Sequence, residues 1–136
     1  MKLCLLLRMV AALTLPLVGV TSILSMAQVD AQRFNCTSPV TTLDMSLCSS
    51  LDVKASDKKL NQIYAQLSLK LAGQQRQRLV AAQQAWIKFR DASCAYESGQ
   101  FEGGTLAPVV KNSCIARVTR QRTQDLENYL QDVNSR

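Results

Sequence analysis

The chain has 136 residues, a length that accommodates one domain. It contains 16 basic and 10 acidic residues, and 47% of its residues are hydrophobic, which is typical of a globular rather than a disordered protein. The sequence contains no histidine, so the commonest general base and the commonest zinc or copper ligand are both excluded.

Residues 1–27 have the pattern of a secretory signal peptide. Lys2 and Arg8 give a positive start, an apolar stretch follows, and Ser25-Met26-Ala27 forms a small-x-small cleavage site. The apolar stretch is shorter than the roughly 20 residues that span a bilayer, so we expect cleavage and no stable membrane insertion afterwards. The sequence therefore predicts an exported protein, periplasmic or secreted, whose mature domain covers residues 28–136.

Four cysteines remain in the predicted mature chain: Cys36, Cys48, Cys94 and Cys114. An even number of cysteines in a short exported chain predicts two disulfides. Four cysteines allow three pairings, and we expect Cys36–Cys48 and Cys94–Cys114 because each closes a short loop that contains turn residues. A Cys4 zinc site normally has C-x2-C pairs, which this sequence lacks. We therefore expect no metal and no cofactor.

Helical signals begin after a polar lead-in. Thr41 and Asp44 have the spacing of a capping box, which predicts a short helix that ends near Cys48. A second helix is predicted from about Val53, with Gly73 as its C-terminal stop. Its apolar residues recur at helical spacing, namely Leu60, Ile63, Tyr64, Leu67 and Leu71.

A third helix is predicted from about Gln75 to Tyr96, with Gln83 on its surface and a buried stripe of Leu79, Ala82, Trp86, Phe89 and Cys94. The glycine-rich segment that follows predicts a loop. A fourth helix is predicted from about Leu106, with an apolar stripe of Ile115, Val118, Leu126, Tyr129 and Val133. Sustained strand-like alternation is missing from the sequence. The expected fold class is all-α, a small antiparallel bundle or hairpin array of about four helices with two disulfides.

Several blocks of this sequence resemble the LprI-type lysozyme inhibitor family of exported bacterial proteins. The blocks are TTLDMSLC, ASDKKLNQIY, AAQQAWIKFRDASCA and NSCIARVTRQRTQDL. The resemblance extends from about Cys36 to Leu126 and implies a small disulfide-bonded helical fold. For part of the family it also implies inhibition of c-type lysozyme. Asp44-Met45-Ser46 stands where Glu-Met-Asn is more usual, and the lipid attachment of some members is missing.

Polar and aromatic residues share faces of the second and third predicted helices. By their spacing, Asp57, Asn61 and Tyr64 lie on one face of the second helix, and Trp86 and Arg90 lie on one face of the third. We interpret these residues, together with Asp91, as a structural network. In this network Arg90 pairs with Asp57, or Asp91 pairs with a neighbouring cation, and the pair positions the two helices.

The glycine-rich segment is the candidate binding site, and we expect it to occlude a lysozyme cleft. It consists of Ser98, Gly99, Gln100, Phe101, Glu102, Gly103, Gly104 and Thr105. A Cys94–Cys114 disulfide would pin both its ends and reduce the entropy lost on docking. Polar side chains and glycine N–H groups would donate hydrogen bonds to the two catalytic carboxylates of the lysozyme. Glu97 and Glu102 would make the region locally acidic. A simple helix–helix connection explains the same segment.

The sequence as a whole predicts a non-enzymatic binding protein whose partner is a c-type lysozyme. No catalytic motif or phosphate loop appears in it, and we expect no nucleic-acid partner. The alternative is an envelope interaction module. Such a module would bind an anionic polymer or another envelope protein through a basic helical face at Arg117, Arg120 and Arg122. The oligomeric state is left open.

Overall fold

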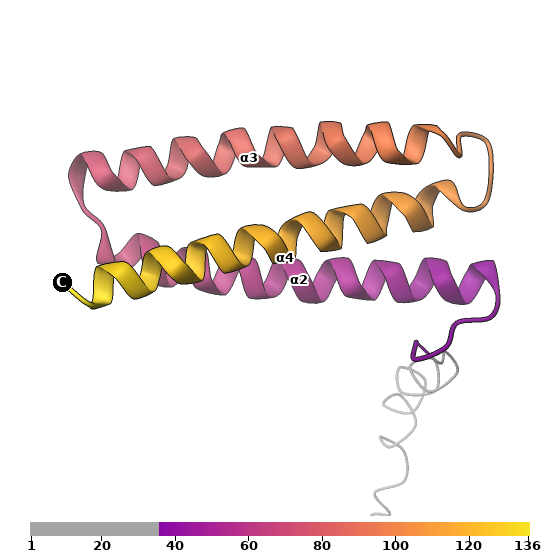
Figure 1. Cartoon of the computed structure of the whole chain (residues 1–136), viewed down its shortest axis with the longest axis horizontal. Coiled ribbons are helices and arrows are strands. Elements are labelled where there is room, and N and C mark those ends of the chain that lie inside the picture. The colour runs from indigo at the N-terminus through magenta and orange to yellow at the C-terminus, as the bar shows by residue number, and fades with distance from the viewer. Residues whose placement is uncertain (1–35) are drawn as a thin grey trace, which may run out of the picture. The chain divides into compact units, whose positions relative to one another are not determined.

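Three long helices make up most of residues 36–136, the part of the chain that the structure, a computed structural model, describes. In chain order they are α2 (Thr42–Lys70), α3 (Gly73–Gly99) and α4 (Ala107–Asn134). Consecutive helices are antiparallel, and α4 packs against both α2 and α3 (Figure 1). The all-α prediction is confirmed, with three helices in this part of the chain instead of about four.

The predicted signal peptide and the first residues of the predicted mature domain lie outside the described residues. Within residues 36–136, no helix contains an apolar stretch long enough to cross a membrane.

The first two predicted helices form one continuous helix, α2, so the break expected near Cys48 is wrong. The predicted capping box is present: the Asp44 backbone N–H donates to Thr41 Oγ1 at 3.1 Å, and the Thr41 N–H donates to Asp44 Oδ2 at 3.3 Å. Two buried serines in this helix satisfy their hydroxyls internally, because each donates to the carbonyl three residues earlier. The distances are 2.9 Å for Ser49 and 3.0 Å for Ser56.

The link between α2 and α3 is short, and Gly73 belongs to α3 instead of stopping α2. Helix α2 ends at Lys70, and Gly73 begins α3 with a φ of 51°, a left-handed conformation that favours glycine. The Arg76 side chain satisfies carbonyls at the end of α2: its Nε donates to the Ser68 oxygen at 3.1 Å and to the Leu71 oxygen at 2.9 Å. This side-chain cap stabilises the sharp reversal between the two helices.

Two clusters of buried side chains hold the helices together, and Trp86 packs against both. The larger one draws on all three helices and consists of Leu60, Ile63, Leu67, Leu79 and Leu126. The smaller one lies around the α3–α4 disulfide and consists of Cys94, Cys114 and Val118. Burial of these apolar surfaces is the main stabilising contribution to the fold.

The buried stripe of α3 differs from the predicted one. Ala82 and Phe89 are exposed, whereas Gln83 is buried, with 8% of its surface exposed. The inward face runs through Leu79, Gln83, Trp86, Arg90 and Cys94. The fourth predicted helix is correct in position, but Tyr129 is exposed and Arg122 is buried. Helix α4 buries polar residues because it packs against helices on two sides.

Candidate functional site

Both disulfides lie towards the same end of the three helices, where α2 begins, α3 ends and α4 begins. We call it the disulfide end. Cys36 bonds Cys48 and Cys94 bonds Cys114, which is the pairing that the sequence predicts. A hydrogen bond of 3.3 Å from Asn112 Nδ2 to Ser49 Oγ joins α4 to α2 here. The backbone at this end is therefore fixed by covalent and polar links as well as by packing.

The predicted binding loop is shorter than expected, because Ser98 and Gly99 belong to the last turn of α3. The connection proper runs from Gln100 to Leu106, and Figure 1 shows it closing the α3–α4 hairpin at the end where α2 begins. Gly103 has a φ of 76°, a left-handed conformation that a turn accommodates most easily with glycine. The Cys94–Cys114 disulfide, with its Cα atoms 5.5 Å apart, ties the two helices below this connection.

The connection satisfies several of its own backbone donors. The N–H of Phe101 donates to the Ser98 oxygen at 3.0 Å, and the N–H of Glu102 donates to the Gly99 oxygen at 3.2 Å. The Gly104 N–H donates to the Phe101 oxygen at 3.0 Å, so this one of the glycine N–H groups expected to face a partner is already engaged. Donors in the connection that are suited to a partner include the side chains of Gln100 and Thr105, both exposed.

Phe101 stands out from this connection, with 41% of its surface exposed. Together with Glu102, Gly104, Thr105 and Leu106 it lines a shallow depression. An aromatic side chain held on a short, internally bonded turn loses little conformational freedom when a partner covers it. This arrangement suits a protein–protein contact.

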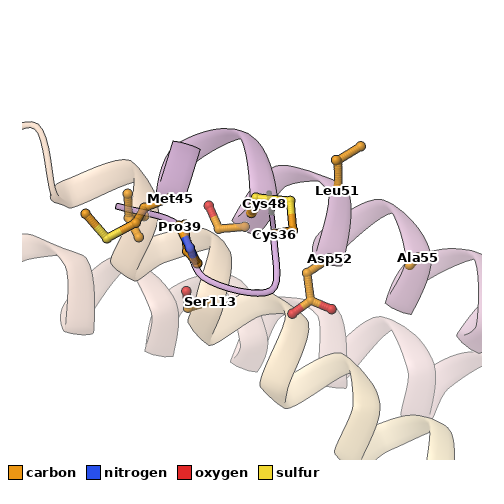
Figure 2. A pocket seen from close by; sticks show the side chains of 10 residues that line it. Cys36, Pro39, Met45, Cys48, Leu51, Asp52, Ala55 and Ser113 are labelled. Carbon is orange, nitrogen blue, oxygen red and sulfur yellow. A yellow bond between two sulfur atoms is a disulfide. The ribbon is translucent and has the colours of Figure 1, made fainter. Parts of the chain in front are cut away.

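A groove lies at the same end, beside the Cys36–Cys48 disulfide (Figure 2). The segment before α2 contributes Pro39, α2 contributes Met45 and Asp52, and α4 contributes Val109 and Ser113. The groove is mostly apolar and has a volume of about 560 Å³. It is a second depression at the disulfide end into which a partner's side chain fits.

Large hydrophobic side chains are exposed at the disulfide end, both in the connection and around the start of α2. The set, between 41% and 85% exposed, consists of Val40, Leu43, Leu51, Phe101 and Leu106. Exposed apolar surface of this kind is typical of interaction sites, because its burial by a partner is favourable. The sequence-based prediction missed the first three. For Leu43 and Leu51, exposure could have been predicted from the sequence, because both fall outside the apolar stripe of α2.

The acidic residues at the disulfide end are largely neutralised. Arg117 Nη2 lies 2.6 Å from Glu97 Oε1, and Arg120 Nη1 donates to both carboxylate oxygens of Asp52 at 2.7 Å. Of the two acids expected to make the loop acidic, Glu97 is therefore paired. Glu102 forms no ion pair with any residue in 36–136.

The expected basic face on α4 is not formed. Arg117 and Arg120 form the ion pairs just described, and Arg122 is buried, with 9% of its surface exposed. Arg122 Nε donates to Gln83 Oε1 at 3.1 Å, in the interface between α4 and α3. Of the three arginines expected on this face, only Arg117 and Arg120 are exposed, and each is paired with a carboxylate.

The residues predicted as a structural network meet between α2 and α3. Arg90 Nη1 lies 3.5 Å from Asp57 Oδ1, Arg90 Nη2 lies 2.8 Å from Asp91 Oδ1, and its guanidinium stacks 5.2 Å from the centre of the Trp86 ring. Asn61 and Tyr64 line the same shallow groove as Asp57, Trp86 and Arg90. These contacts join helices, and they lie away from the connection between α3 and α4.

The described residues offer no site for a metal: no group of three or more histidine, cysteine, aspartate or glutamate side chains gathers within 36–136. The four cysteines in this range are engaged in disulfides. The disulfide end therefore presents exposed apolar and polar groups, with the unpaired carboxylate of Glu102 among them, on a crosslinked base.

Comparisons with known proteins bear on the family and the fold. A family model described as "Lysozyme inhibitor LprI" matches residues 35–126. An uncharacterized protein of Rhizobium meliloti (strain 1021) is 25% identical over 114 residues, which cover 74% of this chain and 82% of that protein. The crystal structure of a DUF1311 family protein from Pseudomonas putida KT2440 superimposes with a TM-score of 0.61 at 21% identity, covering 71% of this chain and 97% of the other. That likeness concerns the fold.

Proposed function

The chain belongs to the lysozyme inhibitor LprI family, and from this membership we propose that it is an exported protein that inhibits a c-type lysozyme by occluding its active-site cleft. The family match is the observation that carries the proposal. It extends over residues 35–126 and so includes all four cysteines of the two disulfides and the connection between α3 and α4. The disulfides support a location outside the cytoplasm.

The disulfide end is the surface that we assign to the lysozyme. It combines a short turn on a crosslinked base with exposed apolar side chains and a neighbouring groove. A lysozyme cleft holds two catalytic carboxylates and apolar walls that contact sugars. Phe101 would fill a sugar subsite, while the Gln100 amide and the Thr105 hydroxyl would donate hydrogen bonds to the carboxylates. Inhibition by this route requires occupancy only, without any chemical step.

Charge gives this complex little long-range attraction, since c-type lysozymes are basic and the predicted mature chain is itself basic, with 14 basic against 10 acidic residues. At physiological ionic strength, screening by salt limits the range of this repulsion to about 8 Å. Pairing of Arg117 and Arg120 with acidic residues also removes two free cations from the disulfide end. We therefore expect apolar contact and hydrogen bonds to dominate the affinity.

A lysozyme turbidity assay tests the proposal. The purified protein should slow the lysis of bacterial cell walls, and Phe101→Ala should weaken inhibition by about tenfold to a hundredfold, because buried aromatic anchors dominate interface energies. Phe89→Ala is the matched control: Phe89 is 62% exposed and lies on α3, away from the connection. Its variant should inhibit as the unchanged protein does.

Two results would contradict the proposal. If a large molar excess of the protein leaves lysis by c-type lysozyme unchanged, the activity itself is wrong. If Phe89→Ala and Phe101→Ala weaken inhibition equally, the disulfide end is not the contact surface.

A further inference from the structure

A pocket lies at the end of the helices opposite to the disulfide end, where α2 ends, α3 begins and α4 ends. We call it the distal pocket. Its volume of about 560 Å³ is within the range of small-molecule sites. Two of its lining residues, Leu67 and Leu79, belong to the main core cluster. Leu71, Tyr129 and Val133 complete an apolar lining, so the pocket opens directly onto the hydrophobic core.

The charged residues around this apolar lining are mostly basic. Arg78, Arg122 and Arg136 line the distal pocket, against one acidic side chain, that of Asp132, among its lining residues. Within residues 36–136, Arg78 forms no ion pair or side-chain hydrogen bond, so its charge is free to meet a ligand. An apolar pocket with excess positive charge suits a ligand that combines an apolar body with an acidic group.

Arg122 provides the second, independent indication of such a ligand. It is 9% exposed, and its side chain is held in place by the 3.1 Å hydrogen bond from its Nε to Gln83 Oε1. Its Nη1 forms a long ion pair of 4.0 Å with Asp125 Oδ2, beyond hydrogen-bond distance, and its Nη2 is buried without a hydrogen-bond partner in the described part of the chain. A buried charged donor without an acceptor is unfavourable, and an acidic group in the pocket would supply acceptors to this guanidinium.

We propose that the distal pocket binds a small amphiphilic anion. Its apolar body packs against Leu67 and Leu79, and its carboxylate or phosphate group binds Arg122, with Arg78 as a second cation. A basic protein such as lysozyme does not fit this charge pattern. The site lies at the other end of the helices from the connection with Phe101, so this proposal does not depend on lysozyme inhibition.

Titration calorimetry with dodecanoate, kept below its micelle-forming concentration, tests the proposal. We expect saturable binding of one dodecanoate per chain. Arg78→Gln should weaken binding by about tenfold, because a hydrogen bond to a charged group is lost. Lys88→Gln is the matched control, since it also removes one positive charge from an exposed site on α3 and lies outside the distal pocket. It should bind dodecanoate as the unchanged protein does.

Arg122→Gln should weaken dodecanoate binding at least as much as Arg78→Gln, in protein whose circular dichroism shows that it is folded. If Arg122→Gln does not fold, Arg78→Gln and the head-group comparison decide. Dodecyltrimethylammonium, which has the same chain and the opposite charge, should bind at least about tenfold more weakly than dodecanoate. Absence of saturable dodecanoate binding, equal binding by Arg78→Gln and Lys88→Gln, or equal binding of the cationic analogue would each overturn the proposal.

Discussion

The Arg90 guanidinium makes three contacts, one of which, to Asp57, joins α3 to α2. It pairs with Asp57 of α2, pairs with Asp91 of its own helix, and stacks on Trp86. Its side chain is 17% exposed, so these contacts are only partly screened by water. Interactions of this kind stabilise a fold more than an ion pair on the open surface does.

Arg90→Ala should therefore lower the free energy of unfolding by about 1–2 kcal/mol, since it removes an ion pair, a cation–π contact and the packing of the aliphatic stem. Arg120→Ala is the control, because the pair of Arg120 with Asp52 is more exposed, with side-chain exposures of 55% and 47%. It should cost less than about 1 kcal/mol. Urea unfolding measures both, and an equal loss in the two variants would contradict a structural role for Arg90.

Polar residues explain where sequence-based prediction of side-chain burial failed. Gln83 and Arg122 are buried together through one hydrogen bond, and nothing in their spacing distinguishes them from exposed polar residues. Phe89 was expected in the core because it is aromatic, yet it lies one helical position from Arg90, which takes the inward place. Hydrophobic periodicity predicts that a segment is helical. It does not predict which face of the helix is buried when polar pairs fill part of the interface.

At the scale of the element, the sequence predicted α3 and α4 nearly to their observed bounds and placed the capping box correctly. It failed at the start of α2, where a short helix ending near Cys48 was expected. The hydroxyls of Ser49 and Ser56 donate hydrogen bonds to backbone carbonyls of the preceding turn. A polar residue in the helix interior therefore need not end the helix.

Thr41→Ala tests the cap that begins α2. Loss of the hydroxyl removes the acceptor for the Asp44 N–H, and the free energy of unfolding should fall by about 1 kcal/mol. Thr41→Ser keeps the hydroxyl and should stay within about 0.5 kcal/mol of the unchanged protein. Thermal unfolding followed by circular dichroism distinguishes them. Similar losses in the two variants would show that the capping hydrogen bond contributes little.

Across the whole molecule, the candidate site was predicted in part. The glycine-rich segment and its neighbouring disulfide were visible as residue types and spacing, so the α3–α4 connection could be chosen from the sequence. The groove beside Cys36–Cys48 could not, because it is formed by residues far apart in the chain, such as Met45 and Val109. The pairing of Glu97 with Arg117 also depends on the packing of α3 on α4.

Removal of the α3–α4 crosslink by Cys94→Ala with Cys114→Ala should lower the free energy of unfolding by about 3 kcal/mol, as expected for a closed loop of 20 residues. It should also weaken lysozyme inhibition under conditions where the variant remains folded, because the base of the connection is then free to move. Guanidinium unfolding and the turbidity assay measure the two effects. A loss of stability without any loss of inhibition would show that the connection does not need this crosslink.

Trp86 is the single tryptophan of the chain and packs against both core clusters. Its indole emission therefore reports on the interior of the helices at two places simultaneously, without any added label. A shift of that emission to longer wavelength marks the entry of water into either cluster. The molecule thus carries its own optical probe for checking the integrity of the variants named above, except Arg90→Ala, which removes a group stacked on the indole itself.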